Sequence, residues 1–182
     1  NDCSISGKKC LTGKGITIGI IDTGVDYTHG DFGGCFGQGC KVVGGYDFVN
    51  NDADPMDDHG HGTHVAGIAV GNGALKGVAP DAELYAYKVL SSSGGGSFDK
   101  IISAIERAVD PNKDGDFSDK IDIISLSLGG KGNPDDPISL AIDNAVESGV
   151  VAVIAAGNSG PGGNIYCRHG GDGSLNSICS PG

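Results

Sequence analysis

The sequence predicts an α/β fold, in which a parallel sheet carries helices on both of its faces. Short segments rich in β-branched apolar residues alternate with segments of helical periodicity. Strands and helices alternate along the chain, which requires right-handed crossovers between parallel strands. Glycine makes up 34 of the 182 residues and concentrates in 29–45, 91–97 and 157–173, which are therefore expected to be loops.

Each element has its own sequence signal. The run ITIGII at 16–21 is apolar on both faces, as a buried parallel strand requires. In the helix expected at 97–109, Ile101 and Ile105 share one face and Ser97 can cap the first turn. The other strands are expected at 82–90, 121–130 and 150–158, and the other helices at 64–70 and 138–149.

Composition narrows the class of protein. A length of 182 residues suits one domain, and the net charge of −11 would repel nucleic acid and anionic membranes, so neither is expected as a partner. No apolar run is long enough for a spanning helix, and the N-terminus lacks a signal-peptide pattern, as in a mature form that has lost its signal.

The six cysteines form three close pairs in glycine-rich sequence: Cys3/Cys10, Cys35/Cys40 and Cys167/Cys179. Local disulfides are predicted, although other connectivities, free thiols or a metal site would also use six cysteines. The absence of a CxxC pattern weakens the zinc and thioredoxin-type alternatives. Disulfides on an acidic chain indicate a secreted, extracellular protein.

Polar and glycine residues follow the predicted strands. Asp22 ends the first strand, the glycines at 94–96 follow the second, residues 128–129 end the third, and Asn158 ends the last. Ligands of open α/β sheets bind beyond the carboxyl ends of the strands. These residues are therefore expected to meet at one edge of the sheet.

The stretch DDHGHGTHVAG at 57–67 contains three histidines in an HxHxxH pattern. This pattern resembles the HxHxDH motif of metallo-β-lactamase-like hydrolases, so a metallohydrolase is one alternative. Thr63 stands where that motif has aspartate, and only His169 follows downstream. The triplet DTG at 22–24 resembles that of aspartic proteases, but their fold is all-β.

A second interpretation combines a carboxylate, a histidine and an asparagine as parts of a serine hydrolase. In such enzymes the carboxylate orients the imidazole and stabilises its charged form. The imidazole takes the proton of the nucleophile and later protonates the leaving amine. The asparagine amide donates a hydrogen bond to the developing oxyanion.

At these residues the chain resembles the subtilisin-like serine peptidases, the subtilase family. GIIDTGVD at 19–26 looks like the family's Asp motif, HGTHVAG at 61–67 its His motif, SLSLGG at 125–130 its substrate-binding strand and AAGNSG at 155–160 its oxyanion motif. The resemblance implies a serine-type endopeptidase with Asp22 as the triad acid, His61 as the base and Asn158 as the oxyanion donor. His64 is then expected to be a packed helix residue, and His59 a loop residue.

The same resemblance implies a polypeptide substrate that binds between two segments as an added strand. The residues expected to bind it are Gly94, Gly95, Gly96, Ser127, Leu128 and Gly129.

The sequence departs from the family because it contains no GTSMA-type serine motif. Residues 1–182 are therefore expected to be the N-terminal portion of a catalytic domain, with its remaining C-terminal part as a partner. This portion alone is expected to be inactive. A pseudoprotease or binding module that has no nucleophile is the alternative.

The acidic segment DPNKDGDFSD at 110–119 predicts a structural Ca²⁺ site. Asp110, Asn112 and Asp114 occupy positions 1, 3 and 5 of a calcium loop, and Gly115 occupies the sixth. Ile121 replaces the expected glutamate at position 12, so Asp116 or Asp119 would have to complete the shell. An acidic, solvated turn is the alternative.

Overall fold

The computed structural model describes residues 11–130 and 135–158, which form two compact units divided between Gly96 and Ser97. Each unit contains parallel strands and helices, which confirms the predicted α/β class. Within the described residues, no helix combines the length and the apolar character needed to cross a membrane.

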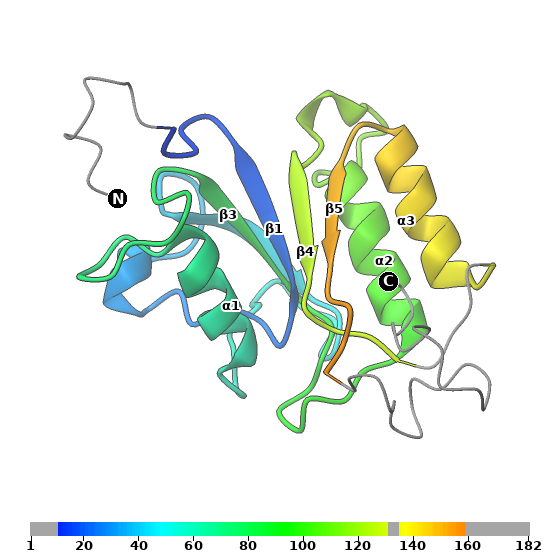
Figure 1. Cartoon of the computed structure of the whole chain (residues 1–182), viewed down its shortest axis with the longest axis horizontal. Coiled ribbons are helices and arrows are strands. Elements are labelled where there is room, and N and C mark those ends of the chain that lie inside the picture. The colour runs from blue at the N-terminus through cyan, green and yellow to red at the C-terminus, as the bar shows by residue number, and fades with distance from the viewer. Residues whose placement is uncertain (1–10, 131–134, 159–182) are drawn as a thin grey trace. The chain divides into compact units, whose positions relative to one another are not determined.

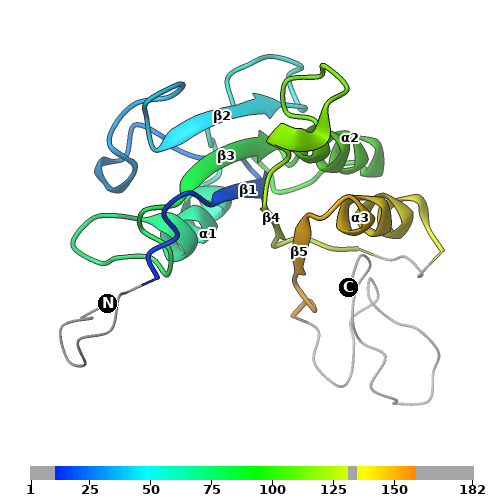
Figure 2. The same ribbon diagram turned by 90° about the horizontal axis from the view of Figure 1, so that it is seen from above.

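The first unit contains three parallel strands. They are β1 (Thr17–Asp22), β2 (Val42–Asp47) and β3 (Glu83–Lys88). β3 pairs with β1 on one side and β2 on the other, and the three strands lie in a row in Figure 2. The register places Asp22 opposite Lys88, so both residues lie at the carboxyl ends of their strands.

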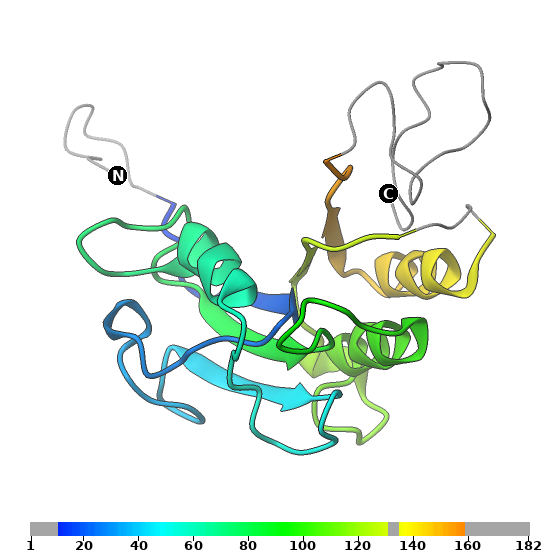
Figure 3. The same ribbon diagram turned by 90° about the horizontal axis from the view of Figure 1, so that it is seen from below.

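Helix α1 (His61–Val70) packs on this three-stranded layer, beside β1 (Figures 1 and 3). The core contains Ile20 and Ile21 of β1 and Ala66 and Val70 of α1, all fully buried. Alternating side chains of β1 point to opposite faces. Burial of both Ile20 and Ile21 therefore confirms that β1 is covered on both sides, as its apolar run predicted.

Strand β2 corrects the expectation that 29–45 is entirely loop. Glycine usually weakens a strand, but here it allows close packing against β3. A Cβ atom added to Gly44 would lie 2.7 Å from the ring of Tyr85, and one added to Gly45 would overlap the carbonyl oxygen of Ala86. The glycines that suggested a loop therefore allow β2 to pack directly against β3. A short 3₁₀ helix (Gly30–Phe32) precedes the strand.

The second unit contains α2 (Phe98–Val109), β4 (Ile123–Leu126), α3 (Pro137–Glu147) and β5 (Val151–Ile154), with a 3₁₀ helix at Phe117–Asp119. β4 and β5 pair in parallel, and α2 and α3 run side by side in Figures 1 and 2. Ile101 and Ile105 of α2 are buried, which confirms the predicted apolar face.

The ends of several elements differ from the prediction. β4 and β5 are shorter than the predicted segments 121–130 and 150–158. Helix α1 begins at His61 rather than at residue 64, after Gly60 in a left-handed conformation with φ of 99°. His61 therefore lies in the first turn of α1.

Candidate active site

Asp22 and His61 form a hydrogen-bonded pair in the first unit. The Nδ1 atom of His61 lies 2.8 Å from Oδ1 and 2.9 Å from Oδ2 of Asp22. The Asp22 side chain is fully buried, whereas 43% of the His61 side chain is exposed. The buried carboxylate thus holds one imidazole nitrogen.

The geometry of this pair assigns the proton positions. A carboxylate accepts hydrogen bonds, so Nδ1 of His61 carries the proton that it donates to Asp22. Its Nε2 then has a free lone pair and can accept a proton from a nucleophile. Asp22 Oδ1 also accepts a 2.7 Å hydrogen bond from the backbone N–H of Thr23, which fixes the carboxylate.

Gly62 allows α1 to approach the end of β1. A Cβ atom at this position would overlap the carbonyl oxygen of Gly24 and would lie 3.2 Å from Asp22 Oδ1. The N–H of Gly62 donates a 2.9 Å hydrogen bond to Thr23 Oγ1. A larger residue would therefore push the helix that carries His61 away from Asp22.

Asp57 joins the two segments that carry this pair. Its Oδ1 accepts a 2.9 Å hydrogen bond from Thr23 Oγ1, and its Oδ2 accepts bonds of 3.0 and 2.5 Å from the N–H and hydroxyl of Thr63. Burial opposes ionisation of this carboxyl, but the bonds from Thr63, Gly60 and His59 outweigh it and lower the pKa of Asp57.

Lys88 is a buried cation beside the same segment. Only 1% of its side chain is exposed, and Nζ donates to Thr23 O at 2.7 Å, to Leu90 O at 3.1 Å and to Asp58 Oδ1 at 2.5 Å. Sequence reasoning missed Asp57, Asp58 and Lys88 as parts of the site. The available signals were a lysine in the mainly apolar stretch AELYAYKVL and a pair of aspartates before the histidines.

The other two histidines of the stretch at 57–67, His59 and His64, are not part of the Asp22–His61 pair. His59 lies in an exposed turn, as predicted, with its ring centroid 6.4 Å from that of His61. His64 lies on α1 but is exposed, so the expectation of a packed residue is wrong. Among the described residues, no group of three or more His, Cys, Asp or Glu side chains is arranged to hold a metal ion.

The residues Gly94, Gly95 and Gly96 lie in an exposed turn that folds back on the segment directly after β3. Ser91 N donates to Gly95 O at 2.9 Å, and Gly96 forms a bridge with Leu90. A Cβ atom on Gly94 would lie 3.4 Å from Nε2 of His59. The structure therefore brings this predicted substrate-binding segment next to the turn that precedes His61.

The predicted site residues of the second unit lie just beyond its two strands. Ser127, Leu128 and Gly129 follow β4, and Asn158 lies beyond β5 and is exposed. Within this unit both segments therefore leave the carboxyl end of a parallel strand, where the sequence placed them.

The acidic loop at 110–119 uses its carboxylates locally. Gly115 N donates to Asp110 Oδ2 at 3.0 Å, Asp114 N to Asn112 Oδ1 at 2.9 Å, and Asp116 N to Asp114 Oδ1 at 2.8 Å. Asp116 caps the 3₁₀ helix that contains Asp119. The side chains thus follow one exposed loop, and calcium binding there stays a prediction.

A disulfide joins Cys35 and Cys40, with 5.6 Å between their Cα atoms, which confirms one of the three predicted pairs. The pairs Cys3/Cys10 and Cys167/Cys179 lie outside the described residues.

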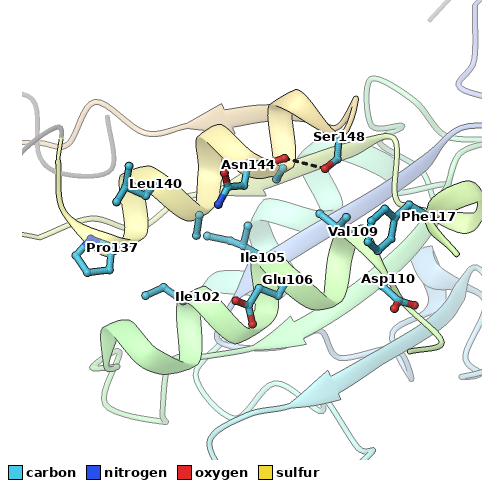
Figure 4. A pocket seen from close by; sticks show the side chains of 12 residues that line it. Ile102, Ile105, Glu106, Val109, Asp110, Phe117, Pro137, Leu140, Asn144 and Ser148 are labelled. Atoms are coloured by element: carbon cyan, nitrogen blue, oxygen red, sulfur yellow. Dashed lines mark hydrogen bonds between the residues drawn. The ribbon is translucent and has the colours of Figure 1, made fainter. Parts of the chain in front are cut away.

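Two hollows have linings that include neither Asp22 nor His61. One, of about 720 Å³, belongs to the first unit and is lined by residues that include His29, His64 and Ile68. The other, of about 520 Å³, lies between α2 and α3, and its wall is mainly apolar (Figure 4). In the first hollow, Nδ1 of His29 lies 3.9 Å from Oδ1 of Asp31 and both side chains are exposed, whereas His61 is hydrogen-bonded to the fully buried carboxylate of Asp22. The Asp22–His61 pair is therefore the candidate active site.

This site pairs a buried carboxylate with an accessible imidazole, and comparison with known proteins defines the class of the chain. Residues 13–178 match the model of the subtilase family, peptidase family S8, so the chain belongs to this family. The resemblance that the four motifs indicated is thereby confirmed.

Individual relatives agree with this assignment. The chain is 49% identical to the minor extracellular protease Vpr of Bacillus subtilis, over 84% of the chain and 19% of Vpr. It is 40% identical to subtilisin E of the same species, over 84% of the chain and 37% of that protein. The crystal structure of a cold adapted subtilisin-like serine proteinase superposes with a TM-score of 0.69 at 38% identity, covering 84% of this chain and 50% of that one. The chain thus spans half or less of the length of these relatives.

Proposed function

We propose that this chain supplies the acid and the base of a subtilisin-like serine endopeptidase. The observation that carries the proposal is the hydrogen-bonded pair of buried Asp22 and accessible His61. His61 Nε2 would take the proton of a serine hydroxyl as that oxygen attacks the peptide carbonyl carbon. His61 would then deliver the proton to the leaving amine, and water would hydrolyse the acyl-enzyme by the reverse roles.

The nucleophilic serine of the proposal lies outside residues 1–182, in the C-terminal part of the catalytic domain. Asn158 would donate its side-chain amide to the oxyanion, a contact of about 3 kcal/mol in barrier height. The segments 94–96 and 127–129 would bind the substrate backbone as strands do. The exposure of residues 94–96 and the position of residues 127–129 directly after β4 support this role.

The proposed substrate is a polypeptide, and the proposed location is extracellular. The Cys35–Cys40 disulfide supports an oxidising compartment. Relatives differ in this respect, because Vpr is named an extracellular protease whereas a relative at 41% identity is named the major intracellular serine protease of Bacillus subtilis. We also propose structural calcium in the loop at 110–119, supported by the calcium-loop spacing of Asp110, Asn112 and Asp114 in the sequence.

Substitution of each histidine of α1 in the full-length protein tests the function. His61→Ala should lower kcat by about 10⁴-fold or more, and Asp22→Asn by about 10⁴-fold, because each removes a member of the triad. His64→Ala is the matched control, since it makes the same change on the same helix without touching Asp22. It should leave kcat within about twofold.

Inhibitors distinguish the alternatives. A serine-directed phosphonylating reagent should abolish turnover, whereas a zinc chelator should not. Inhibition by the zinc chelator alone would favour a metallohydrolase. Binding of peptide without turnover in the full-length protein would favour a binding module. The 182-residue chain alone should have no peptidase activity, and turnover by it that His61→Ala abolishes would contradict the proposal.

A further inference from the structure

We propose that Asp57 is a positioning residue, which sets the alignment of His61 with Asp22 without contacting either side chain. This inference rests on the proposed function, because it concerns the same acid–base pair. Asp57 lies in the turn before α1, four residues before His61.

The Asp57 carboxylate accepts five hydrogen bonds. Oδ1 accepts from Thr23 Oγ1, His59 N and Gly60 N, each at 2.9 Å. Oδ2 accepts from Thr63 N at 3.0 Å and from Thr63 Oγ1 at 2.5 Å. One carboxylate therefore holds the start of α1 and the residue that directly follows Asp22.

These bonds also fix the direction of two hydroxyl groups. The Thr23 hydroxyl has one proton, which it donates to Asp57, so its lone pairs are free to accept the N–H of Gly62 at 2.9 Å. The Thr63 hydroxyl likewise donates to Asp57 and accepts the N–H of Asp26 at 2.9 Å. Gly62 directly follows His61 in α1. Asp57 orients the Thr23 hydroxyl and so controls the hydrogen bond from Gly62 N to Thr23 Oγ1, which ties the start of α1 to the end of β1.

Asparagine cannot replace this aspartate, although the two side chains have the same shape. An amide offers one acceptor oxygen and one NH₂ group. At the Oδ1 position the NH₂ group would face the N–H groups of His59 and Gly60, and at the Oδ2 position it would face the N–H of Thr63. In either orientation two donors meet, so the turn must shift, and His61 moves with it.

The expected result of Asp57→Asn in the full-length protein is a loss of about 10- to 100-fold in kcat with little change in KM, because a small misalignment of reacting groups has this effect. Chemical shifts of isotopically labelled ring nitrogens should show His61 with the proton on Nδ1 in the wild type. The Asp57→Asn variant should show a mixture of the two tautomers.

Asp47→Asn is the matched control. Asp47 is a buried aspartate that holds a turn in the same way, by accepting from Val49 N at 2.6 Å, Asn50 N at 2.8 Å and Asn50 Nδ2 at 2.8 Å. None of these donors neighbours Asp22 or His61. Asp47→Asn keeps an acceptor oxygen for both backbone donors, and the Asn50 amide can turn to accept the new NH₂ group. It should therefore change the melting temperature little and keep the His61 tautomer and kcat.

Threonine variants test the proposed route. Thr23→Val removes the hydroxyl and should reproduce the tautomer change of Asp57→Asn, whereas Thr23→Ser keeps the hydroxyl and should restore the wild-type spectrum. Addition of Thr23→Val to Asp57→Asn should have little further effect, because both substitutions interrupt the same link.

The proposal is overturned if Asp57→Asn keeps the wild-type kcat and His61 tautomer, whether or not its melting temperature falls. It is equally overturned if the wild-type protein lacks the Nδ1 tautomer. Failure of the proposed function has a different signature, which is an absence of turnover in the wild type. The spectra still decide the role of Asp57 in that case, because they need no nucleophile.

Discussion

The turn at residues 57–60 and the loop at residues 110–119 each contain carboxylates, and in both some of these accept backbone N–H groups, but the resulting hydrogen bonds connect different parts of the chain. Asp57 binds Thr23, which is 34 residues away in the sequence, and the bond is partly buried. In the acidic loop, Asp110 and Asp114 accept only from donors within five residues, and these bonds are exposed.

This difference matters because the value of a hydrogen bond depends on what it holds and on whether water can replace it. Water readily replaces an exposed local bond, so its net contribution is small. A partly buried bond between distant segments fixes their relative position, and its loss leaves donors unsatisfied. The turn at 57–60 can therefore align His61 with Asp22, whereas the loop at 110–119 acts only on itself unless a cation binds.

The largest expected effect concerns two glycines, one near each acidic segment. Gly62→Ala should destabilise the protein by about 3 kcal/mol, because its Cβ meets the backbone of Gly24. Gly115 has a positive φ of 81° but open space around it, so Gly115→Ala should cost about 1 kcal/mol through backbone strain alone. Denaturant unfolding of both variants measures the difference. Equal losses would contradict the distinction between the two segments.

A smaller effect is expected when the buried Lys88 loses its anion. Asp58→Asn should lower the free energy of unfolding by about 2 kcal/mol, less than for a fully buried pair because the Asp58 side chain is 51% exposed. The double variant with Lys88→Met and Asp58→Asn removes both charges. It should recover part of the stability that Asp58→Asn alone loses. Denaturant unfolding of the single and double variants measures these free energies. An unchanged stability of Asp58→Asn would show that solvent already screens the charge of Lys88.

The pH dependence of stability separates Asp57 from Asp114. The pKa of Asp57 lies below its ordinary value of 3.8, so the stabilisation from its ionised form is complete above pH 3.8 and is lost as pH falls through the lowered pKa. At pH 6 the Asp57→Asn variant should be less stable than the wild type by about 1 kcal/mol, which lowers its melting temperature by several degrees. The difference in melting temperature should shrink below pH 3.8.

Asp114→Asn is the control for this pH series, since the Asp114 side chain accepts only from its own exposed loop. Without calcium it should change stability by less than about 0.5 kcal/mol at any pH. If Asp114→Asn lost as much stability as Asp57→Asn, with the same dependence on pH, the two acidic segments would not differ in the way described.

The smallest expected effect is that of calcium on the acidic loop. A single site should add about 0.4 kcal/mol when free calcium equals its dissociation constant, and the gain should grow logarithmically above it. A calcium titration of the melting temperature, with calorimetry, measures this in the wild type and in Asp114→Asn. A wild-type curve that stays flat from chelator to millimolar calcium, with no heat of binding, would exclude the site.

Much of the fold could be predicted from the sequence, and the exceptions have identifiable causes. The apolar run before Asp22 and the periodicity around Ile101 and Ile105 are local signals of a buried strand and an amphipathic helix. Strand β2 was missed because Gly44 and Gly45 carry no such signal. The need for glycine at these positions becomes visible only in the structure, where any side chain would meet Tyr85 or Ala86 of the neighbouring strand. His64 was misplaced because α1 leaves that face of the helix exposed.

The sequence by itself determined the parts of the candidate site. It identified Asp22 and His61 through motifs whose residue types and order are specific to one family, and it placed Asn158 beyond a strand. Only the tertiary structure decided how the acid and the base are held. The contacts of Asp57 with Thr23 and of Lys88 with Asp58 join segments that are 34 and 30 residues apart. Their energies come from burial and hydrogen-bond geometry, which exist only once the strands and α1 have packed together.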